Sequence, residues 1–233
     1  MSYTYNNISL ENTKFKLQSN NFPQLVRNKK EVSVVGRNGS IFIDQGTFAN
    51  RVIDCTHIST QYKEDSYTTL FNFFGDSVGE LVFDDNKKLK WIVDDVQLDD
   101  IEEQGHGIVH SFKASFVCRP FRKLVNEKEY QITTSTLKVK NEGVIECCPN
   151  FTIQPFDYKT DIIITVNGKK FTILNVQGSL GTVYVLGDSK TVIQGKKVLE
   201  TSGEFPVLNK GDNTITGTES FESATIMMNE NYA

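Results

Sequence analysis

The residues that could carry catalysis in this chain are cysteines, histidines and carboxylates. None of its three histidines, His57, His106 and His110, stands in a spacing that would gather several ligands around one metal ion. Cys55 and His57 could pair as thiolate and imidazole, but they lie two apart on a strand and lack the third group that such a pair needs. We therefore predict no metal site, no cofactor and no catalytic residue.

Adjacent carboxylates are frequent, at Asp84-Asp85, Asp94-Asp95, Asp99-Asp100 and Glu102-Glu103. A glycosidase needs two carboxylates facing one cleft, with one in an apolar setting that raises its pKa. Neighbours on a strand point to opposite faces and acids in turns are solvated, so these pairs indicate an acidic surface. The sequence also has no Gly-x-Ser-x-Gly elbow, Walker A loop or dinucleotide fingerprint. We predict that the protein is not an enzyme.

The length and the net charge of the chain limit the classes of protein to which it can belong. The chain has 233 residues and a net charge of −4, which favours one large or two small globular domains and disfavours specific nucleic-acid binding. Its apolar runs fall far short of the ~20 residues that span a bilayer. Its first residues do not show the basic stretch followed by an apolar stretch that is typical of a secretory signal. We expect neither membrane insertion nor a secretory signal, and we expect the four cysteines to be reduced thiols.

The dominant pattern is a period of two in segments rich in Val, Ile, Thr and Phe, which predicts a mainly β protein. We predict one hairpin over 31–43, with Asn38-Gly39 supplying positive φ in its turn. A second is predicted over 161–174 around Asn167-Gly168, and a third pairs 182–186 with 191–194.

One stretch, 65–75, has a helical period instead. Tyr67, Leu70, Phe71 and Phe74 recur at positions i, i+3, i+4 and i+7, and Gly75 follows where a helix would end. This predicts a short amphipathic helix with those four residues on its buried face. Strand-like runs follow at 79–83, 89–98 and 108–118.

A change of pattern after Pro120 indicates two domains. Residues 121–131 mix charges without periodicity, so we place an N-terminal β domain at 1–130 and a C-terminal domain at 131–233. The second domain has seven or eight predicted short strands, a number typical of a two-sheet sandwich.

Small sandwiches often bind sugars, and this is the alternative function that the composition leaves open. Such a carbohydrate-binding adhesion module would present an aromatic ring to a pyranose face. The only tryptophan, Trp91, lies in the first domain, and the rings available in the second are Phe151, Phe156, Tyr158, Phe171 and Tyr184. Aromatic residues in strands more often pack a core than stack on a ligand.

Five segments follow one another in a characteristic order. They are the hairpin carrying Val35-Gly36-Arg37-Asn38-Gly39, the helix ending in Phe73-Phe74-Gly75, the strand carrying Trp91, the run 112–121, and 204–215, where an apolar-Pro-x-Leu turn precedes a Gly-x-Asn-x-Ile strand. In order and spacing they resemble the distal tail proteins of long-tailed, non-contractile phages (the siphophage tail component family). The resemblance covers nearly the whole chain.

The resemblance implies a structural hub protein of a phage or prophage tail tip, located in the virion tail and assembled in the host bacterial cytoplasm. It implies a homo-hexameric ring of N-terminal domains, each followed by a galectin-like β-sandwich. Such a ring joins the tail tube protein to a tail-associated hub or baseplate protein, and DNA passes through its lumen without specific binding.

Two surfaces are candidates for a role in such a ring, one in contacts between subunits and one in lining the lumen. A ring closes only if each copy offers two different complementary surfaces, and a projecting hairpin can supply one of them. The candidate inter-subunit residues are Val34, Val35, Arg37, Asn38, Ile41 and Phe42. The candidate lumen-facing acids, chosen for their charge density, are Asp94, Asp95, Asp99, Asp100, Glu102 and Glu103.

Overall fold

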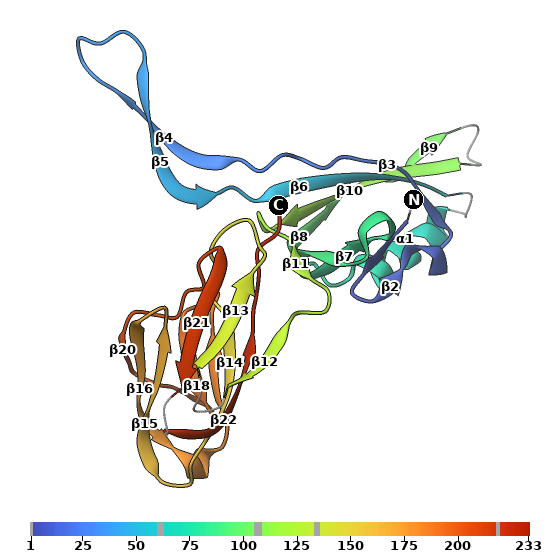
Figure 1. Cartoon of the computed structure of the whole chain (residues 1–233). Coiled ribbons are helices and arrows are strands. Elements are labelled where there is room, and N and C mark those ends of the chain that lie inside the picture. The colour runs from blue at the N-terminus through green and yellow to red at the C-terminus, as the bar shows by residue number, and fades with distance from the viewer. Residues whose placement is uncertain (1, 60–62, 105–108, 133–135, 218–219) are drawn as a thin grey trace. The chain divides into compact units, whose positions relative to one another are not determined.

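The computed structural model describes residues 2–59, 63–104, 109–132, 136–217 and 220–233 (Figure 1). The chain forms two compact units: the first ends at Arg122 and also takes in Ala233, and the second spans Lys123–Tyr232. A division between 130 and 131, the expected position, would cut through β12 (Glu129–Ile132). All four residues of β12 pair with β22 (Phe221–Met227), which keeps the whole strand in the second unit.

The first unit is built on an antiparallel sheet with the strand order β2-β1-β7-β8-β10-β6-β3, and β9 is paired to β10. The predicted strands at 79–83, 89–98 and 108–118 are present as β7, β8 and β10. The bounds are β1 (Tyr3–Tyr5), β2 (Ile8–Ser9), β3 (Phe15–Asn20), β6 (Arg51–Ser59), β7 (Gly79–Phe83), β8 (Leu89–Leu98), β9 (Glu102–Gln104) and β10 (Val109–Cys118).

One face of this sheet is buried under α1 (Lys63–Phe74), the single α-helix among the described residues. Alternate residues of β6, namely Ile53, Cys55 and His57, are fully buried, as the period of two requires. The ring of Phe74 lies 6.0 Å from that of Tyr5 and 5.9 Å from that of Phe116. The core of this unit is therefore largely aromatic.

The helix was predicted correctly, but its buried face was not. Leu70 and Phe74 are buried as expected, and Phe73 is buried with them, whereas Tyr67 is 51% and Phe71 is 76% exposed. The helix thus presents the face of Leu70, Phe73 and Phe74 to the sheet. Since aromatic residues occur on both sides of it, periodicity alone did not distinguish the two faces.

The second unit is the expected two-sheet sandwich, with sheets in the orders β12-β22-β14-β17-β18-β19 and β13-β21-β15-β16-β20. The expected seven or eight strands were too few, because edge strands of two or three residues carry no readable pattern. The remaining bounds are β11 (Lys123–Leu124), β13 (Thr136–Asn141), β14 (Asn150–Pro155), β15 (Lys159–Val166), β16 (Lys169–Gln177), β17 (Val183–Leu186), β18 (Thr191–Gln194), β19 (Lys197–Val198), β20 (Thr201–Gly203) and β21 (Gly211–Gly217).

The hairpins predicted in this unit are both present. β15 and β16 pair up to Val166 and Lys169, and the two residues between them, Asn167 and Gly168, have φ of 51° and 80°. Two positive φ values at an Asn-Gly pair are typical of the tight turn that matches strand twist. β17 and β18 pair from Val183↔Gln194 to Leu186↔Thr191.

Candidate inter-subunit interface

The predicted N-terminal hairpin is formed by β4 (Arg27–Ser33) and β5 (Ser40–Phe48), which make a two-stranded sheet of their own. Figure 1 shows these strands leaving the sheet of the first unit. Near their base, Nη1 of Arg27 donates to Asp44 at 2.9 Å, and Nδ2 of Asn28 donates to Thr47 at 3.0 Å. The Gly46 amide and the Arg27 guanidinium lower the pKa of the Asp44 carboxyl.

The loop at the tip is longer than the predicted tight turn. The strands stop at Ser33 and Ser40, and the amide of Arg37 donates to the carbonyl of Val34 at 3.1 Å. Positive φ occurs at Gly36 (82°) and Gly39 (81°), and Asn38 is not among the described residues with positive φ. The two glycines therefore supply the backbone conformations assigned to the Asn38-Gly39 pair.

Both faces of the hairpin carry exposed apolar side chains. Phe42 is 62% and Ile43 is 52% exposed, and because they are adjacent on a strand they point to opposite faces. At the tip, Val34 is 44% exposed and Val35 is fully exposed. An isolated two-stranded hairpin is at best marginally stable in water, so these faces suit packing against another chain.

The structure places all six candidate interface residues on this one hairpin. Val34, Val35, Arg37 and Asn38 are exposed in the loop, while Ile41 is half-buried and Phe42 exposed on β5. Sequence reasoning missed Ile43, although the same alternating run 40–43 contains it. At the base, the rings of Phe48 and Phe121 meet edge to face at 5.0 Å, which fixes β5 to its own unit.

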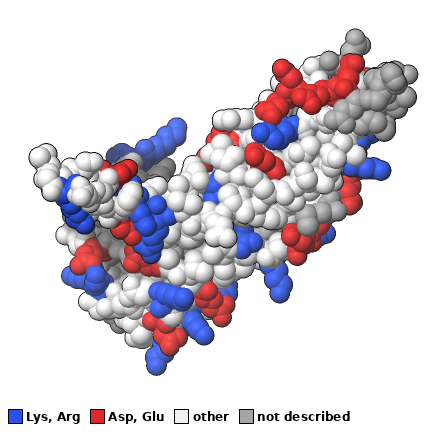
Figure 2. Space-filling view, turned by 90° about the horizontal axis from the view of Figure 1, so that it is seen from above, with Lys and Arg blue, Asp and Glu red and all other residues white. Residues whose placement is uncertain are grey.

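The candidate lumen acids lie on β8, β9 and the segment between them. Asp95 is half-buried, and the others, Asp94, Asp99, Asp100, Glu102 and Glu103, are exposed. Asp94 accepts from Nε of Arg119 at 3.0 Å, and Asp99 lies 3.5 Å from Nζ of Lys113. The surface shown in Figure 2 mixes basic and acidic side chains, and the acidic ones occur in several places on it.

The residues considered for catalysis are built into the core. Cys55 is fully buried, and burial raises the pKa of its thiol to about 12. His57 is also fully buried and shares a hydrogen bond of 2.8 Å with the hydroxyl of Tyr3. His110 is buried, and His106 lies outside the described residues.

The described ranges contain neither a metal-binding cluster nor a membrane-spanning helix. They contain no group of three or more His, Cys, Asp or Glu side chains placed to hold a metal ion. Nor does any helix in them combine the length and apolar character needed to cross a membrane.

The aromatic residues considered for sugar stacking divide between core and surface. Phe151 and Phe171 are buried in the sandwich, whereas Tyr158 is 58% and Tyr184 is 46% exposed. Phe156 stacks on Tyr158 with ring centroids 5.4 Å apart, so one face of Tyr158 is already covered.

The Gly-x-Asn-x-Ile pattern has a structural role. Nδ2 of Asn213 donates to the carbonyls of Asn209 and Gly211, both at 2.8 Å, and Oδ1 accepts from the Asn209 amide at 2.8 Å. Oδ1 also accepts from Nδ2 of Asn167, in the β15–β16 turn, at 2.7 Å. One buried amide thus joins the turn before β21 to the neighbouring hairpin.

This fold, a sheet with a projecting hairpin followed by a two-sheet sandwich, is shared with solved structures of phage proteins. The chain superposes on SPP1 Dit, a protein whose structure is described as "a Paradigm of Hub Adsorption Apparatus in Gram-positive Infecting Phages". The TM-score is 0.72 at 14% identity, over 100% of this chain and 99% of that one. The resemblance to distal tail proteins inferred from the sequence is therefore confirmed at the level of the fold.

A component of the phage P2 baseplate, solved in its activated conformation with Ca and with Sr, has the same fold. The TM-scores are 0.52 and 0.51 at 10% identity, and each superposition covers 97% of both chains. At the level of sequence, no family model and no curated protein matches the chain.

Proposed function

We propose that the protein is a structural hub of a phage or prophage tail tip, and that six copies form a closed ring. The observation that carries this proposal is the likeness to SPP1 Dit over the whole length of both chains. In the proposed assembly the ring joins the tail tube protein to a tail-associated hub or baseplate protein. Its place is the virion tail, after assembly in the bacterial cytoplasm, and its role involves no catalysis.

In this proposal the β4–β5 hairpin is the arm by which one copy holds the next. Its exposed apolar side chains lie on both faces, so a neighbouring subunit can bury them without rearranging the core of the unit that carries them. Backbone pairing along an exposed strand edge would add directional contacts. A head-to-tail contact of this kind repeats around a ring because arm and acceptor are different surfaces.

The acids of β8 and β9 are proposed to face the lumen of the ring. Five of the six are exposed, and a surface of like charge to DNA lets the duplex move past without adhering. Lysine substitution of Asp100, Glu102 and Glu103 should then make assembled rings retain duplex DNA at low salt. If rings with these substitutions released DNA as the wild type does, the lumen assignment would be wrong.

The assembly itself is tested on the purified protein over a wide range of concentration. We expect size-exclusion chromatography with light scattering to give a hexamer mass, or monomers that convert to hexamers as concentration rises. Negative-stain images of the same fractions should show rings. A monomer at every concentration, in the presence of the neighbouring tail proteins as well, would overturn the proposal.

A further inference from the structure

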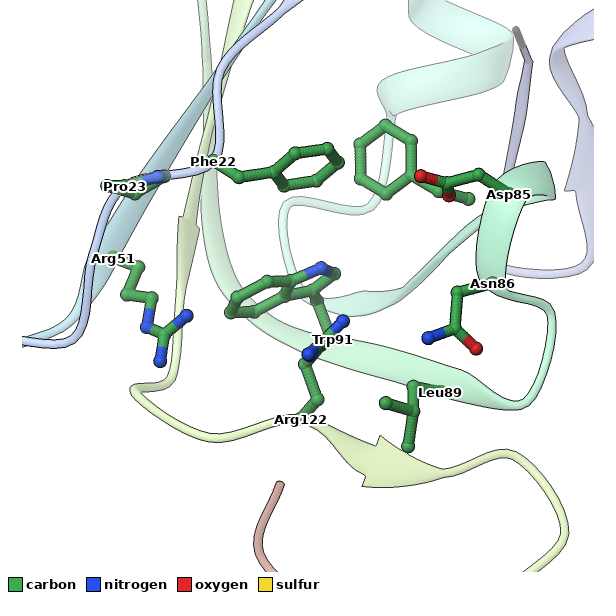
Figure 3. A pocket seen from close by; sticks show the side chains of 9 residues that line it. Phe22, Pro23, Arg51, Asp85, Asn86, Leu89, Trp91 and Arg122 are labelled. Atoms are coloured by element: carbon green, nitrogen blue, oxygen red, sulfur yellow. The ribbon is translucent and has the colours of Figure 1, made fainter. Parts of the chain in front are cut away.

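A pocket of about 460 Å³ lies in the first unit, beside the only tryptophan of the chain (Figure 3). Its aromatic wall is made by Phe22, Phe83 and Trp91. Two arginines, Arg51 at the start of β6 and Arg122 at the end of the unit, lie next to Trp91, and Asp85 also lines the pocket. Nothing in the proposed assembly uses these residues.

Both guanidinium groups are held against Trp91. The guanidinium carbon of Arg51 lies 5.1 Å from the centroid of the indole ring, and that of Arg122 lies 5.4 Å from it. Arg51 is only 8% exposed, although arginine is among the residues least often buried without a partner. Two cations are thus held by the same aromatic ring.

Each of these arginines has one buried donor that is not used. Within the described residues, Nε of Arg51 and Nε of Arg122 are buried and have no partner. Arg122 does donate from Nη2 to the main-chain oxygen of Ala233. A guanidinium carries five N–H donors in a planar fork that matches an oxyanion, and here the Nε–H of each fork has no acceptor among the described residues.

The positive and negative charges in the pocket are also unequal in number. Burial lowers the pKa of Arg51, and the nearby positive charge of Arg122 lowers it further. The carboxylate of Asp85 acts on Arg122 in the opposite direction, since it raises the pKa of that arginine. Both arginines stay charged at neutral pH, so two cations face one carboxylate.

We propose that this pocket is a binding site for an oxyanion, a carboxylate or a phosphate group, gripped by Arg51 and Arg122 beside Trp91. The anion fills the empty donors and relieves the repulsion between the two guanidinium groups. The remaining volume, with its aromatic wall, accommodates the apolar part of the molecule or side chain that carries the anion.

The position of Trp91 gives a direct assay. The purified protein is titrated with sodium phosphate and, separately, with sodium glutarate, at an ionic strength held constant with sodium chloride. We expect a saturable change in tryptophan fluorescence with a millimolar dissociation constant for at least one of the two anions. The anion that binds more tightly identifies the source, phosphate or carboxylate.

Variants distinguish the pocket from a general effect of salt. Arg51→Gln and Arg122→Gln should each weaken binding about tenfold, since each removes a charge-assisted contact. Asp85→Asn should strengthen it, because it removes the opposing carboxylate. Arg119→Gln is the matched control, since it is the same substitution at an exposed arginine that pairs with Asp94 outside the pocket, and binding should be unchanged.

A second measurement covers the case in which Arg51→Gln unfolds or the indole does not respond. In a ¹H–¹⁵N spectrum, the Nε–H signals of Arg51 and Arg122 should shift with the same dissociation constant. If neither phosphate nor glutarate produces saturable shifts or fluorescence changes, the proposal fails. It also fails if Asp85→Asn and the two pocket arginine variants bind as the wild type does.

Discussion

The hydroxyl of Tyr3 lies 2.8 Å from Nε2 of His57 in the buried core of the first unit. The imidazole also stacks on Phe112, with ring centroids 4.6 Å apart, so it is enclosed by aromatic rings. Burial lowers the pKa of His57 from 6.5 to about 4 and raises the pKa of Tyr3. The histidine is therefore neutral in the folded state at neutral pH.

This predicts a loss of stability in mild acid. Between pH 6.5 and about 4 the unfolded chain binds a proton at His57 that the folded chain does not. The stabilisation is complete above pH 6.5 and falls as the pH drops, by about 3 kcal/mol in total. Urea unfolding, followed by the fluorescence of Trp91 in the same unit, measures this loss.

The control for that prediction is His57→Gln, which keeps a partner for Tyr3 but does not titrate. Its free energy of unfolding should vary less over the same pH interval than that of the wild type. Equal pH dependence in the two proteins would show that carboxylates, and not His57, control acid stability.

The thiols give a second prediction. Burial raises the pKa values of Cys55, Cys118 and Cys147 to about 12, and only Cys148 is partly exposed. We expect a thiol reagent at pH 8 to modify one of the four cysteines in the native protein and all four in urea. Cys148→Ser should abolish the native reaction, and rapid modification of a second thiol would contradict the burial.

Local chemistry accounts for what the sequence predicted well. An Asn-Gly pair between alternating strands is sufficient to place the β15–β16 turn, because the backbone conformation is decided by those two residues. The face of α1 could not be predicted, since Phe71 and Phe73 are equally apolar and only the sheet selects between them. The arginine pocket could not be predicted either, because Arg51, Trp91 and Arg122 come together from segments far apart in the sequence without a motif.

The amide of Asn213 carries a third prediction. Asn213→Ala removes the hydrogen bonds that its side chain makes to the turn before β21, so the main-chain groups of Asn209 and the half-buried carbonyl of Gly211 lose these partners. We expect a loss of about 2–4 kcal/mol in the stability of the sandwich. Hydrogen exchange of β21, measured by mass spectrometry, reports it locally.

Asn209→Ala is the matched control, because Asn209 contributes only its main chain to this network and its side chain is exposed. It should leave the exchange of β21 close to that of the wild type. Equal effects of the two substitutions would mean that the turn, and not the Asn213 amide, sets the stability.

The hairpin carries the last prediction. Phe42 is 62% exposed on a strand that the first unit leaves uncovered, so replacing it should not disturb that unit. If a neighbouring copy buries this side chain, Phe42→Asp places a carboxylate in an apolar contact, and its desolvation disfavours assembly. Mass photometry should then show monomers at concentrations where the wild type forms rings, with an unchanged melting temperature.

The matched control is Val198→Asp, the same kind of change at a side chain that is 71% exposed on β19 of the sandwich. Rings should form with this substitution as they do in the wild type. If both variants assembled normally, the arm would have to lie elsewhere, and Tyr67 and Phe71 on the exposed face of α1 would be the next side chains to replace. If neither variant assembled, the loss would reflect added negative charge in general. A Phe42→Ser variant distinguishes this effect from the loss of an apolar contact, because it removes the phenyl group without adding charge.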